Sequence, residues 1–193
     1  MENSQRTRLR DGSMVLIRPV GADDGDLLAE GFNRLSARSR RLRFLSGKSR
    51  LSRDDLAYLT QVDHHDHEAI GALDPEDGRG LGVARYIRSS RDPDCAEVAV
   101  TVVDDWQHRG LGSELLARVT QRAREEGIGR FTALVSSDNL AVAALLRDSG
   151  AAVRQLHQEG GETEYLIDLP RQGLGQDLSK LLRAFAAHAT RHE

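Results

Sequence analysis

The sequence predicts an α/β fold in which helices flank a central sheet, because strand-like and helix-like periods alternate along the chain. The strongest strand pattern is CAEVAVTVV at 95–103, whose nearly continuous apolar, β-branched run is typical of a strand buried on both faces. A glycine turn, an amphipathic helix ending at Gly127 and the strand RFTALVS at 130–136 follow it and complete a βαβ unit. With 193 residues, 39% of them hydrophobic, the chain is long enough for one well-buried domain.

Periodicity and turn residues predict the other elements. Strands are expected at 14–20, 68–73, 83–89, 151–157 and 162–170. Helices are expected within 21–35, 37–45, 51–62, 138–149 and 177–189. Ser52 followed by Asp55 has the pattern of a capping box at the start of the third helix. The turn-rich connection DPEDGRGLG predicts that 68–73 and 83–89 form a hairpin.

Composition excludes several classes of protein. A net charge of −3 argues against a protein that grips nucleic acid through a basic face. The single Cys95 allows no internal disulfide, and the first residues lack the apolar run of a signal peptide. Because no apolar stretch approaches the roughly 18 residues of a membrane span, a soluble cytoplasmic protein is expected.

Two glycines, Gly110 and Gly112, stand where the helix of the βαβ unit begins. Glycine in a helix interior costs roughly 0.5–1 kcal/mol relative to alanine, so bare backbone here should bring a compensating gain. The right-handed crossover places this helix N-terminus beyond the carboxyl end of 95–103, where free N–H groups and the helix dipole attract phosphate. The glycines therefore indicate either a phosphorylated ligand that approaches the backbone closely or a turn that needs positive φ.

Two phosphate-binding motifs that the sequence lacks limit which phosphate ligand is possible. The pattern Gly-x-x-x-x-Gly-Lys-Ser/Thr of a P-loop does not occur in the sequence. The dinucleotide pattern Gly-x-Gly-x-x-Gly fails because Leu115 stands at the third glycine position. Gly-Leu-Gly recurs at 80–82 and 173–175, but the first continues into a strand pattern and the second has no later strand to complete a βαβ unit.

The stretch QHRGLG, Gln107 to Gly112, resembles the Gln/Arg-x-x-Gly-x-Gly/Ala signature of the GNAT superfamily of N-acetyltransferases, which cradles the pyrophosphate of acetyl-CoA. SSDNLAVAALLRDSGA at 136–151 is similar to a later motif of the superfamily, in which Asn139 begins a helix beside the pantetheine arm. The stretches LRDGSMVLIRPV, GFNRLSARSRRLRFL and LAYLTQVD look more narrowly like the catalytic domain of bacterial protein lysine acetyltransferases of the cyclic-AMP-regulated type. Since nothing before residue 12 resembles their regulatory domain, a stand-alone catalytic domain is expected.

The resemblance implies a mixed, mostly antiparallel sheet flanked by helices, with acetyl-CoA as co-substrate bound at the central βαβ unit and no metal. It divides the chain into an N-terminal extension (1–11), the acetyltransferase domain (12–170) and a C-terminal amphipathic tail (171–193). The residues that it assigns to acetyl-CoA are Thr101, Val102, Gln107, His108, Arg109, Gly110, Leu111, Gly112, Ser113 and Asn139.

Acetyl transfer to an amine requires a base, because a lysine amine has a pKa near ~10.4 and is protonated at pH 7. The resemblance gives this role to Glu97, the only acid within 95–103, for which a surface-facing strand glutamate is the alternative. It also implies a backbone amide near Val102 as donor to the developing oxyanion. Leu146 occupies the position where many relatives have a tyrosine acid, so no general acid is assigned.

The expected acceptor is a protein lysine, with a small amine as the alternative, and a sensor that binds acyl-CoA without turnover as a further alternative. The arginines at 34, 38, 40, 41 and 43 indicate either a solvated helix face or an acceptor groove that favours acidic partners. The stretch HHDHE at 64–68 resembles a metal cluster, but alternate residues of an extended chain point apart, so a solvated loop is expected. The apolar stripe Leu178, Leu181, Leu182 and Phe185 should pack on the domain or on a second subunit.

Overall fold

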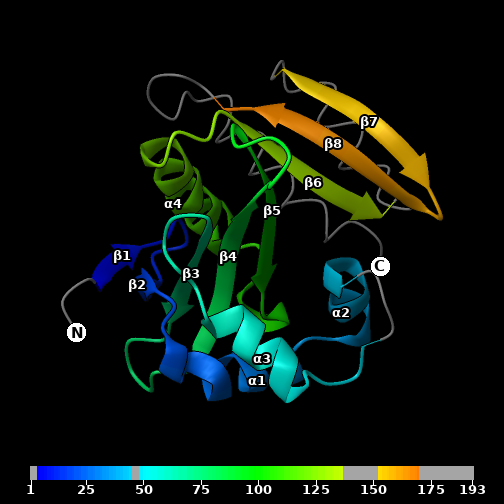
Figure 1. Cartoon of the computed structure of the whole chain (residues 1–193). Helices are drawn as coiled ribbons and strands as arrows, with labels where there is room; N and C mark the ends of the chain where they lie inside the picture. Colours follow the sequence, from blue (N-terminus) through cyan, green and yellow to red (C-terminus); the bar gives the residue numbers. More distant parts are fainter. Residues whose placement is uncertain (1–3, 45–47, 137–151, 170–193) are drawn as a thin grey trace.

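The computed structural model describes residues 4–44, 48–136 and 152–169, and Figure 1 shows their arrangement. The strands are β1 (Gln5–Arg8), β2 (Met14–Pro19), β3 (His67–Leu73), β4 (Gly80–Arg88), β5 (Cys95–Val102), β6 (Arg130–Ser136), β7 (Val153–Glu159) and β8 (Glu162–Asp168). The α-helices are α1 (Gly25–Asn33), α2 (Ala37–Phe44), α3 (Arg53–Thr60) and α4 (Leu111–Glu125), and the short 3-10 helices are η1 (Ala22–Asp24) and η2 (Asp104–Trp106).

The eight strands of the described residues form one sheet in the order β1-β2-β3-β4-β5-β6-β8-β7. All neighbouring pairs are antiparallel except β5 and β6, which are parallel and joined by α4. The predicted mixed, mostly antiparallel sheet with a central βαβ unit is therefore confirmed, as is the hairpin of β3 and β4.

Helices cover both faces of the sheet. The apolar side of α4 is buried against β3, β4 and β5 through Leu111, Leu115, Leu116, Val119 and Ala123. Tyr86 of β4 belongs to the same core, so its neighbour Arg85 leaves the strand on the opposite face. That face is covered by α1 and α3, which lie below the strands in Figure 1. Among the described residues, no helix is both long and apolar enough to cross a membrane.

One predicted helix start is confirmed, one strand was not predicted, and two expected helices lie outside the described residues. The capping box of α3 is confirmed, because Ser52 Oγ accepts from the Asp55 amide at 3.1 Å and Asp55 accepts from the Ser52 amide at 2.8 Å. Strand β1 was not predicted, since QRTR is polar and its place at the sheet edge leaves no apolar period to detect. The helices expected at 138–149 and 177–189, with Asn139 and Leu146, lie outside the described residues.

The expectation that 95–103 is buried on both faces is wrong. Within β5 only Cys95 and Ala96 are buried, whereas Glu97 is exposed and 98–102 are partly exposed. The reason is that β6 pairs only with the first three residues of β5, Cys95 to Glu97. Beyond Glu97 the two strands part, as Figure 1 shows, and apolar side chains line the space between them.

An ion pair holds the start of α1 to β2 and gives a first prediction. Arg18 donates to both oxygens of Asp24 at 2.6 Å, and the Gly21 amide also donates to this carboxylate. These hydrogen bonds, that of Arg18 first, lower the pKa of Asp24 below its ordinary value of 3.8. A carboxylate whose folded-state pKa is lowered stabilises the fold above its ordinary pKa, and this contribution is lost as the pH falls through the folded-state value. We expect Asp24→Asn to cost about 2 kcal/mol of unfolding free energy at pH 7 and less at pH 3, measured by urea titration.

Asp77→Asn is the matched control, because Asp77 pairs with Arg79 at 2.6 Å on the exposed surface. Exposed pairs contribute roughly 0–1 kcal/mol, so this variant should change the unfolding free energy little. Equal losses in the two variants, or a loss at Asp24 that does not depend on pH, would contradict the assigned role of the Arg18 pair.

Candidate active site

The parting of β5 and β6 opens a cavity of about 310 Å³. Residues 97–102 of β5 and 133–136 of β6 form its two sides. Ser39, Leu42 and Arg43 of α2 border it, and Figure 1 shows α2 beneath the opening. The loop before α4 also contributes to the wall, so the cavity extends from the opening to the N-terminus of α4.

The hydrogen-bond pattern of β5 shows which backbone amides face this cavity. Val103 donates to the Leu81 carbonyl at 3.0 Å, and Ser89 donates to the Cys95 carbonyl at 2.8 Å. The odd-numbered residues of β5 are therefore the ones that exchange hydrogen bonds with β4. The N–H groups of the even-numbered residues 100 and 102 point to the other side, beyond the three residues of β5 that pair with β6. These groups can donate to a ligand that lies between the strands.

Gly110 and Gly112 have different roles. Gly110 is the N-cap of α4 with φ 90° and ψ 0°, a left-handed conformation that disfavours any side chain, so the turn interpretation holds at this position. Gly112 has no positive φ, and it lines the cavity. A Cβ there would lie 3.6 Å from Cγ2 of Val102, an ordinary contact, so the protein itself leaves room for a side chain. The interpretation of a close ligand approach therefore stays a prediction for Gly112.

The three residues before these glycines differ in orientation. Gln107 donates through Nε2 to the Val102 carbonyl at 3.0 Å and to Ser39 Oγ at 3.3 Å, which ties the loop to β5 and α2. Gln107 and His108 line the cavity. The guanidinium of Arg109 instead lies 4.8 Å from the ring centre of Trp106. Of the predicted cofactor residues, Thr101, Val102, Gln107, His108, Gly110 and Gly112 line one cavity.

Glu97 lies at the point where the strands part. It is opposite Ile87 of β4 and Thr132 of β6, and it is exposed at the wall of the cavity. Arg43 of α2 is close by: burial lowers the pKa of its guanidinium, and the Glu97 carboxylate partly offsets this effect. A carboxylate and a cation therefore share the inner end of the cavity.

A second, smaller cavity of about 80 Å³ lies beneath α1 and α3, on the face of the sheet opposite α4. Arg43 and Thr101 line both cavities and so mark where they meet. Arg85 of β4 also lines the smaller one and was missed in the sequence. The available signal was a cation inside an apolar strand, just as Glu97 is an acid inside one.

The five clustered arginines, which were expected to form a solvated helix face or an acceptor groove, differ in their surroundings. Arg34 pairs with Asp105 at 3.1 Å, and Arg40 donates to the carbonyls of Asn33 and Ser49, so these two hold the fold. Arg43 turns to the cavity. The remaining two, Arg38 and Arg41, are exposed on α2.

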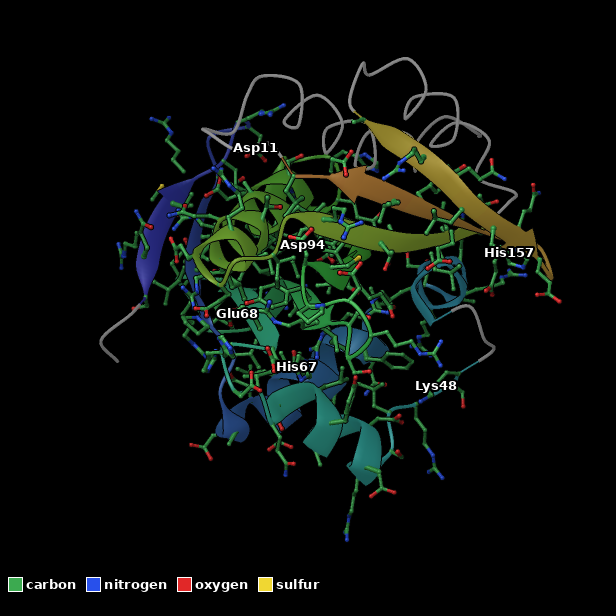
Figure 2. All side chains as sticks on the ribbon, turned by 45° about the horizontal axis from the view of Figure 1, so that its top comes forward. Asp11, Lys48, His67, Glu68, Asp94 and His157 are labelled. Atoms are coloured by element: carbon green, nitrogen blue, oxygen red, sulfur yellow. The ribbon has the colours of Figure 1, made fainter. Side chains whose placement is uncertain are left out.

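The interpretation of HHDHE as a solvated loop holds for His65 and Asp66, which are exposed in the bend before β3, and is wrong for His67 and Glu68, which begin β3. Glu68 is 2% exposed, accepts from His64 Nδ1 at 2.8 Å and pairs with Arg122 of α4 at 3.2 Å. His67 points to the other face of the sheet, and its ring centre lies 5.4 Å from that of Tyr58 in α3. Figure 2 labels His67 and Glu68. These residues fasten β3 to helices on the two faces. Among the described residues, no group of three or more possible ligands could hold a metal ion.

A parted strand pair with backbone donors next to a helix N-terminus that begins with glycines is the arrangement that the resemblance predicts for an acyl-CoA-dependent transferase. The model of the acetyltransferase (GNAT) family matches residues 35–151. The chain belongs to the GNAT family of acetyltransferases. Membership and the names of its relatives indicate an acetyl-CoA-dependent acetyltransferase, as the sequence predicted.

Three relatives are similar over most of the chain. An acetyltransferase of Pseudomonas aeruginosa is 35% identical over 136 residues, which cover 69% of this chain and 73% of the relative. Acetyltransferase Pat of Mycolicibacterium smegmatis is 33% identical over 84% of this chain, which spans only 48% of that relative. The GNAT domain of S. lividans PAT is 31% identical with a TM-score of 0.76, over 86% of this chain and 97% of that one.

Proposed function

We propose that the protein transfers the acetyl group of acetyl-CoA to an amine, with a protein lysine as the acceptor and Glu97 as the general base. The observation that carries this proposal is the position of Glu97, an exposed carboxylate at the point where β5 and β6 part. A thioester placed between the strands would lie beside it, and an acceptor amine could approach both. The resemblance to bacterial protein lysine acetyltransferases supports a lysine acceptor.

The cavity fits acetyl-CoA in two respects. The first turn of α4 leaves the N–H groups of 111–113 without helical partners, which suits the pyrophosphate at Gly112. The inward N–H groups of 100 and 102 suit the amide-bearing pantetheine arm and the thioester oxygen. Thr101, Val102 and Gln107 line the way between these two regions. Asn139, which the resemblance assigns to the pantetheine arm, lies outside the described residues.

The reaction then needs no metal or covalent enzyme intermediate. Glu97, directly or through a water molecule, takes a proton from the ammonium group of the acceptor. The neutral nitrogen attacks the thioester carbon, and a β5 amide near Val102 donates to the oxygen as it becomes negative. The C–N bond forms, the C–S bond breaks, and CoA leaves as a thiolate that takes a proton from water. The nitrogen loses its second proton to solvent.

The charge of α2 favours an acidic acceptor protein. The helix contains four arginines and no acidic residue, and Leu42 and Arg43 place it at the border of the cavity. Arg38 and Arg41 remain exposed on it and can meet carboxylates around the acceptor lysine. Such contacts are screened by salt, so transfer to proteins should weaken as ionic strength rises.

The test is incubation with acetyl-CoA and a panel of lysine-containing proteins, with release of CoA thiol and acetyl-lysine mass spectra as readouts. We expect the double variant Arg38→Glu, Arg41→Glu to raise KM for acidic acceptor proteins roughly tenfold and to change kcat little. The double variant Arg50→Glu, Arg53→Glu is the control, because it makes the same charge change at two exposed positions outside the two cavities. Binding of acetyl-CoA without thiol release from any acceptor would favour the sensor alternative.

A further inference from the structure

Two arginines from different elements lie at the wall of the smaller cavity. Arg85 leaves β4 on the face opposite α4 and is 4% exposed, and Arg43 reaches the same region from α2. Burial lowers the pKa of both guanidinium groups, that of Arg85 to about 10, and the charge of Arg43 adds to the effect at Arg85. Two cations therefore occupy one poorly solvated place.

The partners of Arg85 are neutral. Its Nη1 lies 3.1 Å from Nε2 of His67, and its Nη2 donates to the Leu59 carbonyl at 3.2 Å. Burial and the Arg85 charge lower the pKa of His67, so this ring is neutral at pH 7 and accepts the hydrogen bond. In the part of the chain that the structure describes, no carboxylate forms a hydrogen bond or ion pair with Arg85. A buried cation without a carboxylate is costly, so an anionic ligand would stabilise this position.

The pairing of β4 and β5 places Arg85 close to the proposed base. Arg85 is opposite Ala99, and Ile87 is opposite Glu97, so the side chains of Arg85 and Glu97 leave the same face of the sheet as diagonal neighbours. Such neighbours lie roughly 7–8 Å apart between Cα atoms. Arg43 is near both, because its charge interacts with each of them. An anion held by the two arginines would thus lie beside the acceptor amine from which Glu97 takes a proton.

The rest of the smaller cavity is mostly apolar, apart from Thr101 and the paired Arg18 and Asp24. Its wall includes Leu27, Leu28, Phe32, Leu35, Leu51 and Leu59. A dry cavity of about 150 Å³ can hold benzene, so about 80 Å³ suits an aliphatic group of roughly three or four carbon atoms. The site therefore offers a base, an anion position and a small apolar pocket next to one another.

We infer that the protein also acetylates the α-amino group of free amino acids with small aliphatic side chains, such as leucine, whose carboxylate binds at Arg43 and Arg85. The inference rests on the proposed function, because it uses the same acetyl-CoA and the same base. The nitrogen bonds to the acetyl carbon as the C–S bond breaks. Of the two protons that the ammonium loses, one is released through Glu97 to solvent and the other balances the proton that the CoA thiolate takes up.

The test compares L-leucine with 3-methylbutylamine, which is the same molecule without its carboxylate. With acetyl-CoA as donor, kcat/KM for leucine should exceed that for 3-methylbutylamine roughly 100-fold, since a site built for a charged group rejects an analogue that lacks it. In Arg43→Gln the ratio of the two kcat/KM values should fall at least roughly tenfold, and Arg43→Lys should retain part of it. Arg53→Gln, at an exposed position of α3, should keep the wild-type ratio.

Because the readout is a ratio, a general loss of activity in a variant does not affect it, and thermal melting checks that each variant folds. Equal kcat/KM values for the two amines, or a ratio that Arg43→Gln leaves unchanged, would overturn the inference. A preference for succinyl-CoA over acetyl-CoA that disappears in Arg43→Gln would also overturn it, because the arginines would then bind an acyl carboxylate. If lysine proteins are acetylated in the same assay, the proposed function survives any of these results; if no amine is acetylated, the proposed function itself fails.

Discussion

Replacing Glu97 by glutamine should lower acetyl transfer at pH 7 roughly 10²–10⁴-fold, which is the usual contribution of a positioned base. The change keeps the shape of a side chain that is exposed at the cavity wall, so the fold should be unaffected. Raising the pH should restore part of the rate, because the amine then loses its proton without help. The measurement is kcat/KM for a lysine acceptor between pH 7 and pH 10, by release of CoA thiol.

Two controls make this result specific. Affinity for acetyl-CoA, measured by calorimetry, should hardly change, because Glu97 lies at the opposite end of the cavity lining from the first turn of α4 that is expected to bind the phosphates. Glu76→Gln, in the exposed turn between β3 and β4, should behave like the parent protein. If Glu97→Gln transfers acetyl at the parent rate over the whole pH range, Glu97 is a structural residue and the base is water or another group.

The local pattern of the sequence was sufficient for most of the fold because the elements that hold the sheet together are amphipathic. The period of α4 and the turn between β3 and β4 both depend on residues that are close in sequence. The place where β5 and β6 part has no such signal. An apolar run looks the same whether it packs in a core or lines a ligand cavity, so 98–102 were expected to be buried.

The limit of local sequence patterns also explains which residues of the candidate site could be predicted and which could not. Glu97 was assigned through the family resemblance and also stands out as an acid inside an apolar strand, and the Gly110 region could be found because its motif is contiguous. The arrangement of Arg43 and Arg85 depends on α2 and β4 meeting over the sheet, which no local pattern encodes. The burial of Glu68 likewise depends on Arg122, a residue of α4 that is distant in the chain.

The two glycines of the loop call for separate treatment when they are tested. Replacing Gly110 by valine forces a β-branched residue to φ 90°, at a cost of roughly 1–2 kcal/mol. Gly110→Val is therefore expected to destabilise the fold as well as to alter the candidate binding site. A loss of CoA binding in that variant would mix a folding defect with a binding defect.

Gly112→Val avoids this problem and should raise the dissociation constant for CoA at least roughly 100-fold while it changes the melting temperature by only a few degrees. The free N–H groups at the start of α4 are useful only if a phosphate oxygen can come within hydrogen-bond distance, and the methyl groups of valine would occupy that space. Gly25→Val, at the start of α1 with nothing within 4 Å of its added Cβ, makes the same change away from the cavity and should leave CoA affinity unchanged. Calorimetry with CoA gives the dissociation constants, and unchanged affinity in a folded Gly112→Val protein would mean that the pyrophosphate does not bind at this helix N-terminus.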